Sequence, residues 1–500
     1  MNVIPLPNFF EKRPNTFTFT YNLPIYFSNE FTQTKEHFIN YFSKKSNITL
    51  SDSTSSKVIF LLNLDLHEEG YIIDVTEKSI IAEARTDKGA FYALQTIKQL
   101  IYTNNNLYTI DCILIKDEPR FTYRSFMLDV ARHFFPKETI FKLIDLLSFH
   151  KFNYFHLHLS DDQGFRFKIE KYPLLTKIGS TRKRTKLLGG GYDNTPHSGF
   201  YTKEDMLEII NYAKRNFIEI IPEIDFPGHT TAILASYPEL ACINQNYKVA
   251  ENFGIKKTSL CITKDNTYDF VYSLLDELIA IFPSKFIHIG GDELRIANYK
   301  KCEGCKKLLK ESKSKAKFAN HFINKIASYL REKGKIPIAW NDYINYNTNY
   351  NVISQHWKPF TKNKTIKEIN EGRKTIISNF FYFYLDYPYS MTPLHKTYNF
   401  EPVFSKVISP DNIIGIESPL WTEYVPNDSI LEYQVLPRLA AVSEVAWTNR
   451  ELKNYNDFTK RLKHINEIYS KNYLNFHQNA TKSYSLITRL IKTINWFRGK

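Results

Sequence analysis

No stretch of the sequence reaches the ~18 to 20 consecutive apolar residues that a membrane-spanning helix needs, so we expect no membrane insertion. Cysteine is also scarce: five residues in 500, an odd number spread widely, which argues against a disulfide framework. The first residues, MNVIPLPNFFEKRPNTF, lack the basic segment followed by an apolar one that is typical of a secretory signal. We therefore expect a cytoplasmic protein, or a secreted one if a leader has been removed.

Two of the few cysteines, Cys302 and Cys305, form a CxxC pair in KKCEGCKKLLK. A zinc site would need a second pair of cysteines or suitably spaced histidines, and a redox site would need a thioredoxin-like context. The sequence pattern reveals neither. A lone CxxC is weak evidence, so we expect no metal site and no cofactor.

The chain is basic, with a formal net charge of +14, which raises the question of a polyanionic partner. Its lysines are scattered, however, and the densest cluster, TRKRTK at 181–186, is typical of a solvated loop. We expect no nucleic-acid partner.

Eight short apolar segments occur between residues 125 and 423, most of them separated by stretches with helical periodicity. They are 125–130, 154–160, 218–225, 286–293, 336–342, 352–357, 375–386 and 413–423. Nearly continuous apolar strands that alternate with helices indicate a buried parallel sheet, and eight such units indicate a barrel. The sequence thus predicts an α/β protein with a (β/α)8 TIM barrel over residues 119–450.

The two ends of the chain have different patterns. Residues 1–118 mix strand-like segments such as VIFLLNLDL with helix-like ones such as DKGAFYALQTIKQLIY, which predicts a small α+β domain in front of the barrel. Residues 451–500 are helical and polar, and they predict a C-terminal helical extension.

Polar and aromatic side chains gather at the C-terminal ends of the predicted strands. They are Asp129, His158, Asp161, Asp162, Glu223, Asp225, Asp292, Glu293, Trp340, Trp357, Asp386, Trp421 and Glu423. Active sites of such barrels are built at this end. The distribution therefore indicates where the function lies.

One candidate function is a metal-dependent hydrolase. His156 and His158 share one face of a strand and could bind a divalent ion, with His229 and His288 as further ligands. The set is incomplete as a coordination sphere, and each histidine has the alternative of a hydrogen-bonded place inside the barrel.

The second candidate is glycoside hydrolysis, which needs a general acid and a group that stabilises the oxocarbenium-like centre. Asp292 and Glu293 are adjacent, so they cannot flank a sugar ring from opposite sides as an ordinary carboxylate pair does. Three of only five tryptophans, Trp340, Trp357 and Trp421, lie at the proposed mouth. They indicate an apolar box of the size of a sugar, able to hold a methyl group.

Several long motifs then point to one family. They are RSFMLDVARHFFP (124–136), HLHLSDDQGFR (156–166), IIPEIDFPGH (220–229), HIGGDE (288–293) and the LWTE that ends at Glu423. In this order they resemble family 20 glycoside hydrolases, the β-N-acetylhexosaminidases. KGAFYALQTIKQL (88–100) is similar to the N-terminal module of that family.

The resemblance implies an exo-β-N-acetylhexosaminidase that removes terminal N-acetylglucosamine or N-acetylgalactosamine from glycans or chitooligosaccharides. In that family the substrate's own 2-acetamido oxygen is the nucleophile, which gives an oxazolinium intermediate and retention of configuration; it is an exception to the two-carboxylate scheme. By resemblance, Glu293 protonates the leaving oxygen and later activates water, while Asp292 holds the acetamido nitrogen. Both act on one side of the ring, so adjacent positions suffice, and no metal is required.

The resemblance also implies a set of substrate-binding residues. Arg124 is expected to bind sugar hydroxyls, Asp161 and His229 to support the catalytic pair, and Tyr384 to bind the acetamido carbonyl. The acetamido methyl is expected to lie among the three tryptophans of the proposed mouth. The outer sugar hydroxyls are expected to bind Asp386 and Glu423. The full set is Arg124, Asp161, His229, Trp340, Trp357, Tyr384, Asp386, Trp421 and Glu423.

One departure from the family pattern is Asn341, which stands where an acid often follows the tryptophan of the fifth strand. A different class of function would be a degenerate barrel that binds amino sugars without cleaving them. Such a protein would be expected to lose the acid, whereas Asp292, Glu293 and Tyr384 are all present here.

Overall fold

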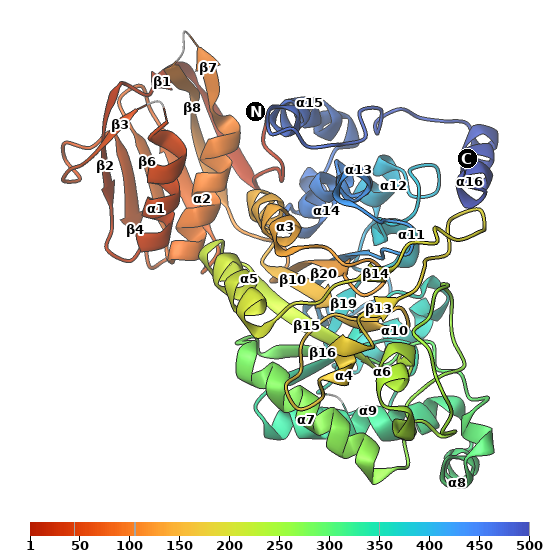
Figure 1. Ribbon diagram of the computed structural model, residues 1–500. Coiled ribbons are helices and arrows are strands. Elements are labelled where there is room, and N and C mark those ends of the chain that lie inside the picture. Colours follow the sequence, from red (N-terminus) through yellow and green to blue (C-terminus); the bar gives the residue numbers. More distant parts are fainter. Residues whose placement is uncertain (45, 105–106, 350, 500) are drawn as a thin grey trace.

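The computed structural model describes residues 1–44, 46–104, 107–349 and 351–499 (Figure 1). A sheet with two helices stands beside a closed barrel, and the last helices pack across the barrel or lie at its edge. Within the described residues, none of the helices is both long and apolar enough to cross a bilayer.

The first domain is one sheet with the order β1-β8-β5-β6-β4-β2-β3, and β7 pairs with β8. Its strands are β1 Phe9–Thr18, β2 Asn22–Phe27, β3 Asn47–Leu50, β4 Val58–Leu62, β5 Tyr71–Val75, β6 Ile80–Ala84, β7 Tyr102–Asn104 and β8 Leu107–Asp117. Helices α1 (Thr32–Phe42) and α2 (Asp87–Leu100) cover one face of it. Alternate side chains of β5 and β6 are buried, as expected for a sheet with one covered face.

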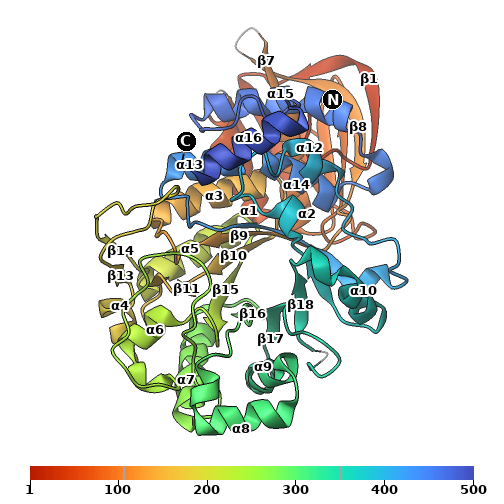
Figure 2. The ribbon, with the colours of Figure 1, turned by 90° about the vertical axis from the view of Figure 1, so that its right-hand side faces the viewer.

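The predicted barrel is confirmed: eight parallel strands close in the order β10-β15-β16-β17-β18-β19-β20-β9. The strands are β9 Tyr123–Asp129, β10 Tyr154–His158, β15 Glu219–Phe226, β16 Phe286–Gly290, β17 Ile336–Trp340, β18 Ile353–His356, β19 Thr375–Ile377 and β20 Ile413–Leu420. Figure 2 shows β15 to β18 with the helices α5, α7, α9 and α10 around them. Two-residue strands also pair outside the barrel: β11 Ser160–Asp161 with β12 Gly164–Phe165, and β13 Thr181–Arg182 with β14 His197–Ser198.

One predicted strand is much shorter than expected. The apolar run 375–386 forms only the three residues of β19, because the side chain of Asn379 accepts a hydrogen bond from the backbone of Phe381 and caps the short helix α11 (Phe380–Phe383). Asn is favoured at this capping position. The chain then turns so that Tyr384 and Asp386 follow the helix.

The helices of the barrel and its loops vary in length. They are α3 Lys137–Phe149, α4 Leu174–Lys177, α5 Lys203–Arg215, α6 Thr231–Ser236, α7 Asp265–Ile281, α8 Glu303–Ser312, α9 Lys315–Glu332, α10 Lys362–Asn370, α12 Leu394–Asn399, α13 Asp428–Val435 and α14 Arg438–Trp447. The C-terminal extension contains α15 (Tyr455–Lys471) and α16 (Leu486–Phe497). None of the residues of α16 is buried.

The inside of the barrel is layered. Near the N-terminal ends of the strands it is filled by an apolar cluster of Tyr123, Ile221, Phe286, Ile338, Ile353 and Ile376. Further along the strands come two buried carboxylates, Glu223 and Glu417, with His156 between them at 3.2 and 3.0 Å. The barrel is therefore closed at one end, and only the other end can admit a ligand.

Buried charges join the first domain to the barrel. Arg124 Nη1 lies 2.7 Å from Glu69 Oε2, and Lys151 Nζ lies 3.3 Å from Asp117 Oδ2. The indole of Trp447 donates to the same Asp117 oxygen at 2.9 Å. Charges this deeply buried are stable only when paired, so the two domains are fixed to each other at these points.

The first residues of the chain contact two helices near its C-terminal end. Arg461 of α15 bonds both oxygens of Glu444 in α14 at 2.7 Å and donates to the carbonyl of Val3, also at 2.7 Å. The backbone of Leu6 donates to Glu444 at 3.1 Å. The first residues of the chain are thus held between α14 and α15.

Candidate active site

The adjacent acids Asp292 and Glu293 stand on a tight turn directly after β16. Gly290 and Gly291 have φ values of 65° and 91°, and Glu293 itself has a φ of 44°. A Cβ on Gly290 would lie 1.7 Å from Asp225 Oδ1, and the backbone of Gly291 donates to that oxygen at 3.0 Å. The chain has left the strand conformation here, so neighbouring side chains need not point to opposite faces.

Both acids lie within reach of His229. Its Nε2 atom is 3.8 Å from Asp292 Oδ2 and 3.7 Å from Glu293 Oε2. Burial and the neighbouring charge of Asp292 raise the pKa of Glu293 to about 7. A carboxyl group with this pKa holds a proton near neutral pH and can donate it, as general acid catalysis requires.

Asp292 has a second carboxyl group beside it. Burial and then the charge of Asp292 raise the pKa of Asp225 well above its usual range, and the two side chains share a hydrogen bond. Burial also raises the pKa of Asp292, while the hydrogen bond from Asp225 works in the opposite direction. Asp225 therefore keeps the proton and uses it to donate a hydrogen bond to Asp292. Asp292 remains the carboxylate of the pair.

The second ring nitrogen of His229 also faces two acids. Its Nδ1 atom lies 3.3 Å from Asp161 Oδ1 and 3.5 Å from Asp162 Oδ2. Burial disfavours the imidazolium, but the charges of Asp161 and Asp292 outweigh it and hold the pKa of His229 well above its usual value. A positive charge thus sits between two pairs of acids.

The predicted aromatic residues come together at the open end of the barrel. Trp357 stacks on Tyr384 with ring centres 6.1 Å apart, and Trp421 lies 5.8 Å from Trp340 and 6.3 Å from Tyr384. Hydrogen bonds fix the indoles: Trp340 donates to Glu223 at 2.9 Å, and Trp357 donates to Asp342 at 2.7 Å. These four rings form an apolar box whose walls cannot easily rotate.

The prediction that Arg124 binds the sugar is wrong. Arg124 is the second residue of β9, at the closed end of the barrel, and it is only 1% exposed. Its guanidinium bonds Glu69, the carbonyls of Phe121 and Lys151, and the hydroxyl of Tyr92. Each of its three guanidinium nitrogens is therefore engaged at the domain interface.

A second arginine of the same motif lies at the open end instead. Arg132 follows β9, and its Nη2 atom is 2.7 Å from Asp161 Oδ2. Its guanidinium lies 4.8 Å from the ring centre of Trp421. Arg132 was not among the predicted site residues, although its position three residues beyond the end of the strand was a usable signal.

The two remaining predicted acids are also at this end. Burial raises the pKa of Asp386 to about 8, and its Oδ1 atom is buried without a hydrogen-bond partner among the described residues. Burial likewise raises the pKa of Glu423, although Arg132 opposes the shift. Two partly buried oxygen acceptors thus face the same space as the aromatic box.

Asp342 is another residue of this site that was not predicted. Its carboxylate accepts from Trp357 Nε1, from the ammonium of Lys358 and, at 3.1 Å, from the backbone of Glu293. Asn341 occupies the family's usual acidic position, and the acid stands one residue later. A carboxylate therefore still links the turn of Glu293 to the aromatic box.

The histidines inside the barrel are paired with carboxylates. His158 bonds Glu223, and His288 Nδ1 lies 2.8 Å from the same side chain. Burial disfavours the charged forms of His156 and His158, but Glu417 and Glu223 outweigh it and raise the pKa of His156 to about 10 and that of His158 to about 9. Both imidazoles are thus hydrogen-bonded to carboxylates inside the barrel, which is the alternative to metal ligation that the sequence left open.

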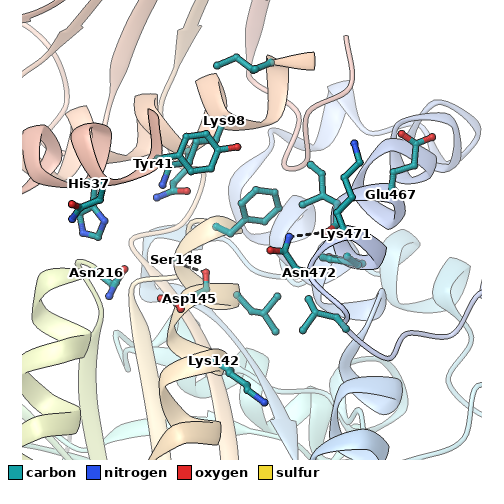
Figure 3. A pocket seen from close by; sticks show the side chains of 18 of the residues that line it. His37, Tyr41, Lys98, Lys142, Asp145, Ser148, Asn216, Glu467, Lys471 and Asn472 are labelled. Carbon is teal, nitrogen blue, oxygen red and sulfur yellow. Dashed lines mark hydrogen bonds between the residues drawn. The ribbon is translucent and has the colours of Figure 1, made fainter. Parts of the chain in front are cut away.

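A cavity of about 1250 Å³ lies elsewhere (Figure 3). Its lining comes from α1, α2, α3, α5 and α15, at the closed end of the barrel where the first domain packs. Labelled residues such as His37, Lys98 and Asp145 point into it. It contains none of the acids or tryptophans of the candidate site, so its size does not make it the active site.

Comparison with known proteins agrees with the geometry. The model of the glycosyl hydrolase family 20 catalytic domain matches residues 121–450, and that of domain 2 of the same family matches residues 1–118. Two curated proteins named β-hexosaminidase are similar to the chain. The one from Porphyromonas gingivalis is 33% identical over 86% of this chain, which spans 58% of that protein. The one from Akkermansia muciniphila is 32% identical over 79% of this chain and 83% of that protein.

A solved structure has the same fold. The exo-β-N-acetylglucosaminidase of Vibrio harveyi, in complex with N-acetylglucosamine, superposes with a TM-score of 0.84 at 28% identity, covering 95% of this chain and 78% of the other. The match extends over the first domain and the barrel together. The chain therefore belongs to glycosyl hydrolase family 20, with domain 2 of the family in front of the catalytic barrel.

Proposed function

We propose that this chain is a retaining exo-β-N-acetylhexosaminidase that uses the substrate's own acetamido group as the nucleophile. The observation that carries the proposal is the turn at 290–293, on which Asp292 and Glu293 stand side by side and which Asp342 links to Trp357 of the aromatic box. Two adjacent acids can serve a reaction in which both act on one side of the sugar. The names of the relatives, β-hexosaminidase and exo-β-N-acetylglucosaminidase, agree with it.

In this mechanism Asp292 orients the nucleophile. Its carboxylate accepts the N–H of the 2-acetamido group, turns the carbonyl oxygen toward the anomeric carbon and stabilises the positive charge of the oxazolinium. The proton kept by Asp225 supports this role, because a hydrogen bond from Asp225 holds Asp292 in place without adding a second negative charge.

Glu293 supplies and recovers the proton. With a pKa of about 7 it is protonated often enough to donate to the leaving oxygen. The resulting carboxylate then removes a proton from the water that opens the oxazolinium. The imidazolium of His229, 3.7 Å away, stabilises the carboxylate at that stage.

The rest of the site positions the sugar. In the proposed complex Tyr384 donates to the acetamido carbonyl, and the tryptophans enclose its methyl. Arg132, with its planar fork of donors, binds ring hydroxyls, and Asp386 and Glu423 accept from them. These polar groups surround a single sugar ring, which supports removal of one terminal residue at a time from a glycan or chitooligosaccharide.

A substrate panel tests the proposal directly. A β-N-acetylglucosaminide, a β-N-acetylgalactosaminide and a plain β-glucoside with the same nitrophenyl leaving group should be compared. We expect turnover only when the 2-acetamido group is present. Equal rates on the plain glucoside would mean that an enzyme carboxylate attacks, and no turnover of any of them would favour a barrel that only binds amino sugars.

A further inference from the structure

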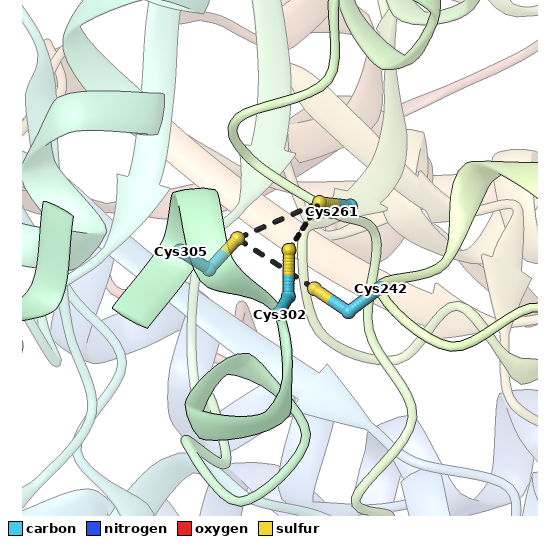
Figure 4. A group of neighbouring side chains, drawn as sticks. All are labelled: Cys242, Cys261, Cys302 and Cys305. Carbon is cyan, nitrogen blue, oxygen red and sulfur yellow. Dashed lines mark hydrogen bonds between the residues drawn. The ribbon is translucent and has the colours of Figure 1, made fainter. Parts of the chain in front are cut away.

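Four of the five cysteines converge in the loops beside the active site. Cys242 and Cys261 lie in the loop between α6 and α7, and Cys302 and Cys305 lie at the start of α8 (Figure 4). The expectation that the CxxC pair stands alone is therefore wrong. Its partners come from a loop about 40 to 60 residues earlier in the chain, a distance over which sequence spacing gives no signal.

The sulfur atoms are spaced as ligands around one ion. Cys305 Sγ lies 3.6 Å from Cys242 Sγ and 3.5 Å from Cys261 Sγ, and Cys261 and Cys302 are 3.8 Å apart. All four sulfurs lie within 4.8 Å of one another. Four thiolates at ~2.3 Å from a tetrahedral zinc are separated by about 3.8 Å. Disulfide sulfurs approach to ~2.0 Å, and an iron–sulfur cluster would hold the thiolates farther apart.

The backbone brings the first pair together. Ala241 and Leu260 form an antiparallel bridge, and the backbone of Cys261 donates to the carbonyl of Leu240 at 2.8 Å. On the other side, Gly304 of the CxxC packs so closely that an added Cβ would lie 2.8 Å from Thr263 Oγ1. An antiparallel bridge thus presents the first pair of cysteines, and the start of α8 presents the second.

The surroundings suit thiolates. Cys302 is the N-terminal cap of α8, a helix of ten residues, so the positive end of the helix dipole lies at the CxxC. Thr263 Oγ1 is 3.1 Å from Cys305 Sγ and can donate a hydrogen bond to it. Lys301 and Lys306 flank the pair in the sequence and add positive charge. Cys261 and Cys305 are fully buried, which protects the cluster from solvent.

We propose that these four cysteines form a closed structural zinc site. Binding converts four thiols to four thiolates, releases four protons to solvent and places a Zn²⁺ at the centre of the sulfurs, with no change of oxidation state. Zinc is the metal that tetrahedral cysteine sites most commonly hold. All four coordination positions are taken by protein, so the ion has no place for a substrate.

The site would fix the two loops that carry the catalytic groups. The loop with Cys242 and Cys261 follows β15 and His229, and the loop with Cys302 and Cys305 follows β16, Asp292 and Glu293. Hydrogen bonds already connect these segments: the backbone of Leu260 donates to Pro227 O at 2.9 Å, and Tyr299 OH donates to Leu260 O at 2.8 Å. A zinc ion would add a strong cross-link to these weak ones.

Metal content of the purified full chain tests the site without reference to activity. We expect about one zinc per chain by elemental analysis, released when a mercurial reagent blocks the thiols. Exchange with Co²⁺ should give the thiolate-to-cobalt charge-transfer band and the visible bands of a tetrahedral sulfur site. The double variant Cys302→Ser/Cys305→Ser should lose the metal and melt at a lower temperature, whereas Cys112→Ala, which changes the one cysteine outside the cluster, should keep it.

Three results would overturn the proposal. The first is a chain purified and refolded with zinc that holds none. The second is alkylation of the unfolded, unreduced protein that leaves four thiols blocked as two disulfides. The third is a metal that remains bound in the double serine variant. If the double variant does not fold, the cobalt spectrum and the zinc release of the unmodified chain decide the matter by themselves.

Discussion

At the residue scale, the functional side chains act through pairs whose protonation the surroundings decide. Glu293 carries its proton near neutral pH because it is buried beside Asp292, and Asp292 is a carboxylate because Asp225 keeps the proton of that pair. His229 is an imidazolium between Asp161 and Asp292. Pairs of titratable groups pushed apart in this way are typical of catalytic acids and bases.

The pKa of Glu293 predicts a pH dependence. Its raised pKa means that the acid form is present below about pH 7 and is lost above it, so kcat/KM should fall on the alkaline side near that pH. In Glu293→Gln this alkaline limb should vanish, and an unactivated disaccharide should lose about 10² to 10⁴-fold in rate, more than a nitrophenyl substrate does. Equal losses on both substrates, in a variant with a native circular dichroism spectrum, would remove Glu293 from the acid role.

Asp292→Ala should have a different signature. In the proposed mechanism every substrate uses the acetamido nucleophile, so activated and unactivated substrates should slow by a similar factor. Steady-state kinetics of both substrates measure this ratio. A variant that spared the unactivated disaccharide would contradict the role of Asp292 in orienting the acetamido group.

The two arginines of the first motif should separate binding from stability. A hydrogen bond to a charged group contributes ~1.5 to 3 kcal/mol, so Arg132→Lys should lower kcat/KM about tenfold to a hundredfold with little change in melting temperature. Arg124→Met leaves Glu69 without its buried partner and should lower the melting temperature instead. If Arg124→Met kept its stability but lost substrate affinity, the placement of the two arginines would have to be exchanged.

At the element scale, the turn after β16 lets the adjacent side chains of Asp292 and Glu293 point to the same side, which a continuous strand could not do. Its two glycines take left-handed φ values, and Gly290 has no room for a side chain against Asp225. The eight strands were predictable because each is a short apolar run, and β19 was too long in the prediction because nothing in an apolar run marks the point at which Asn379 caps a helix. Arg124 and Arg132 carry the same side chain. They differ in position: Arg124 lies near the start of β9, at the closed end of the barrel, and Arg132 lies beyond its end, at the open end.

Substitution in this turn should be far more damaging than at a comparable glycine. Gly290→Ala forces a Cβ into Asp225 at a φ of 65°, so we expect little folded protein or none of its activity. Gly334→Ala is the matched control: its φ is 75°, but nothing lies within 4 Å, and the strain should cost only ~1 to 2 kcal/mol. Activity and melting temperature of both variants measure the difference.

At the scale of the whole molecule, the first domain and the barrel are joined by buried charges rather than by a flexible linker. The α+β and barrel domains could be predicted from their patterns, but this interface could not, because its partners are distant in the sequence: Glu69 pairs with Arg124, and Asp117 with Lys151. The clustering of the four cysteines could not be predicted for the same reason, because the two pairs are distant in the sequence.

The interface should weaken in acid. Burial opposes ionisation of Glu69, but Arg124 and Lys88 outweigh it and lower its pKa to about 2. The stability that ionised Glu69 contributes with these two partners is about 3 kcal/mol. It is therefore complete above the ordinary pKa of a glutamate and is lost as pH falls toward 2. Glu69→Gln should lower the melting temperature at pH 6, and the gap to the unmodified protein should narrow at pH 3. A gap that did not depend on pH would contradict this account.

The closure of the barrel has a consequence for biosynthesis. β9 pairs with β20, and Val3 and Leu6 bond Arg461 and Glu444, so early parts of the chain find their partners only in its last fifth. A ribosome that makes the protein from the N-terminus releases β9 long before β20 exists, and until then the growing sheet has open edges that can pair with other chains. Messages truncated before residue 413 should therefore yield products that need chaperones and aggregate, however complete their catalytic acids are.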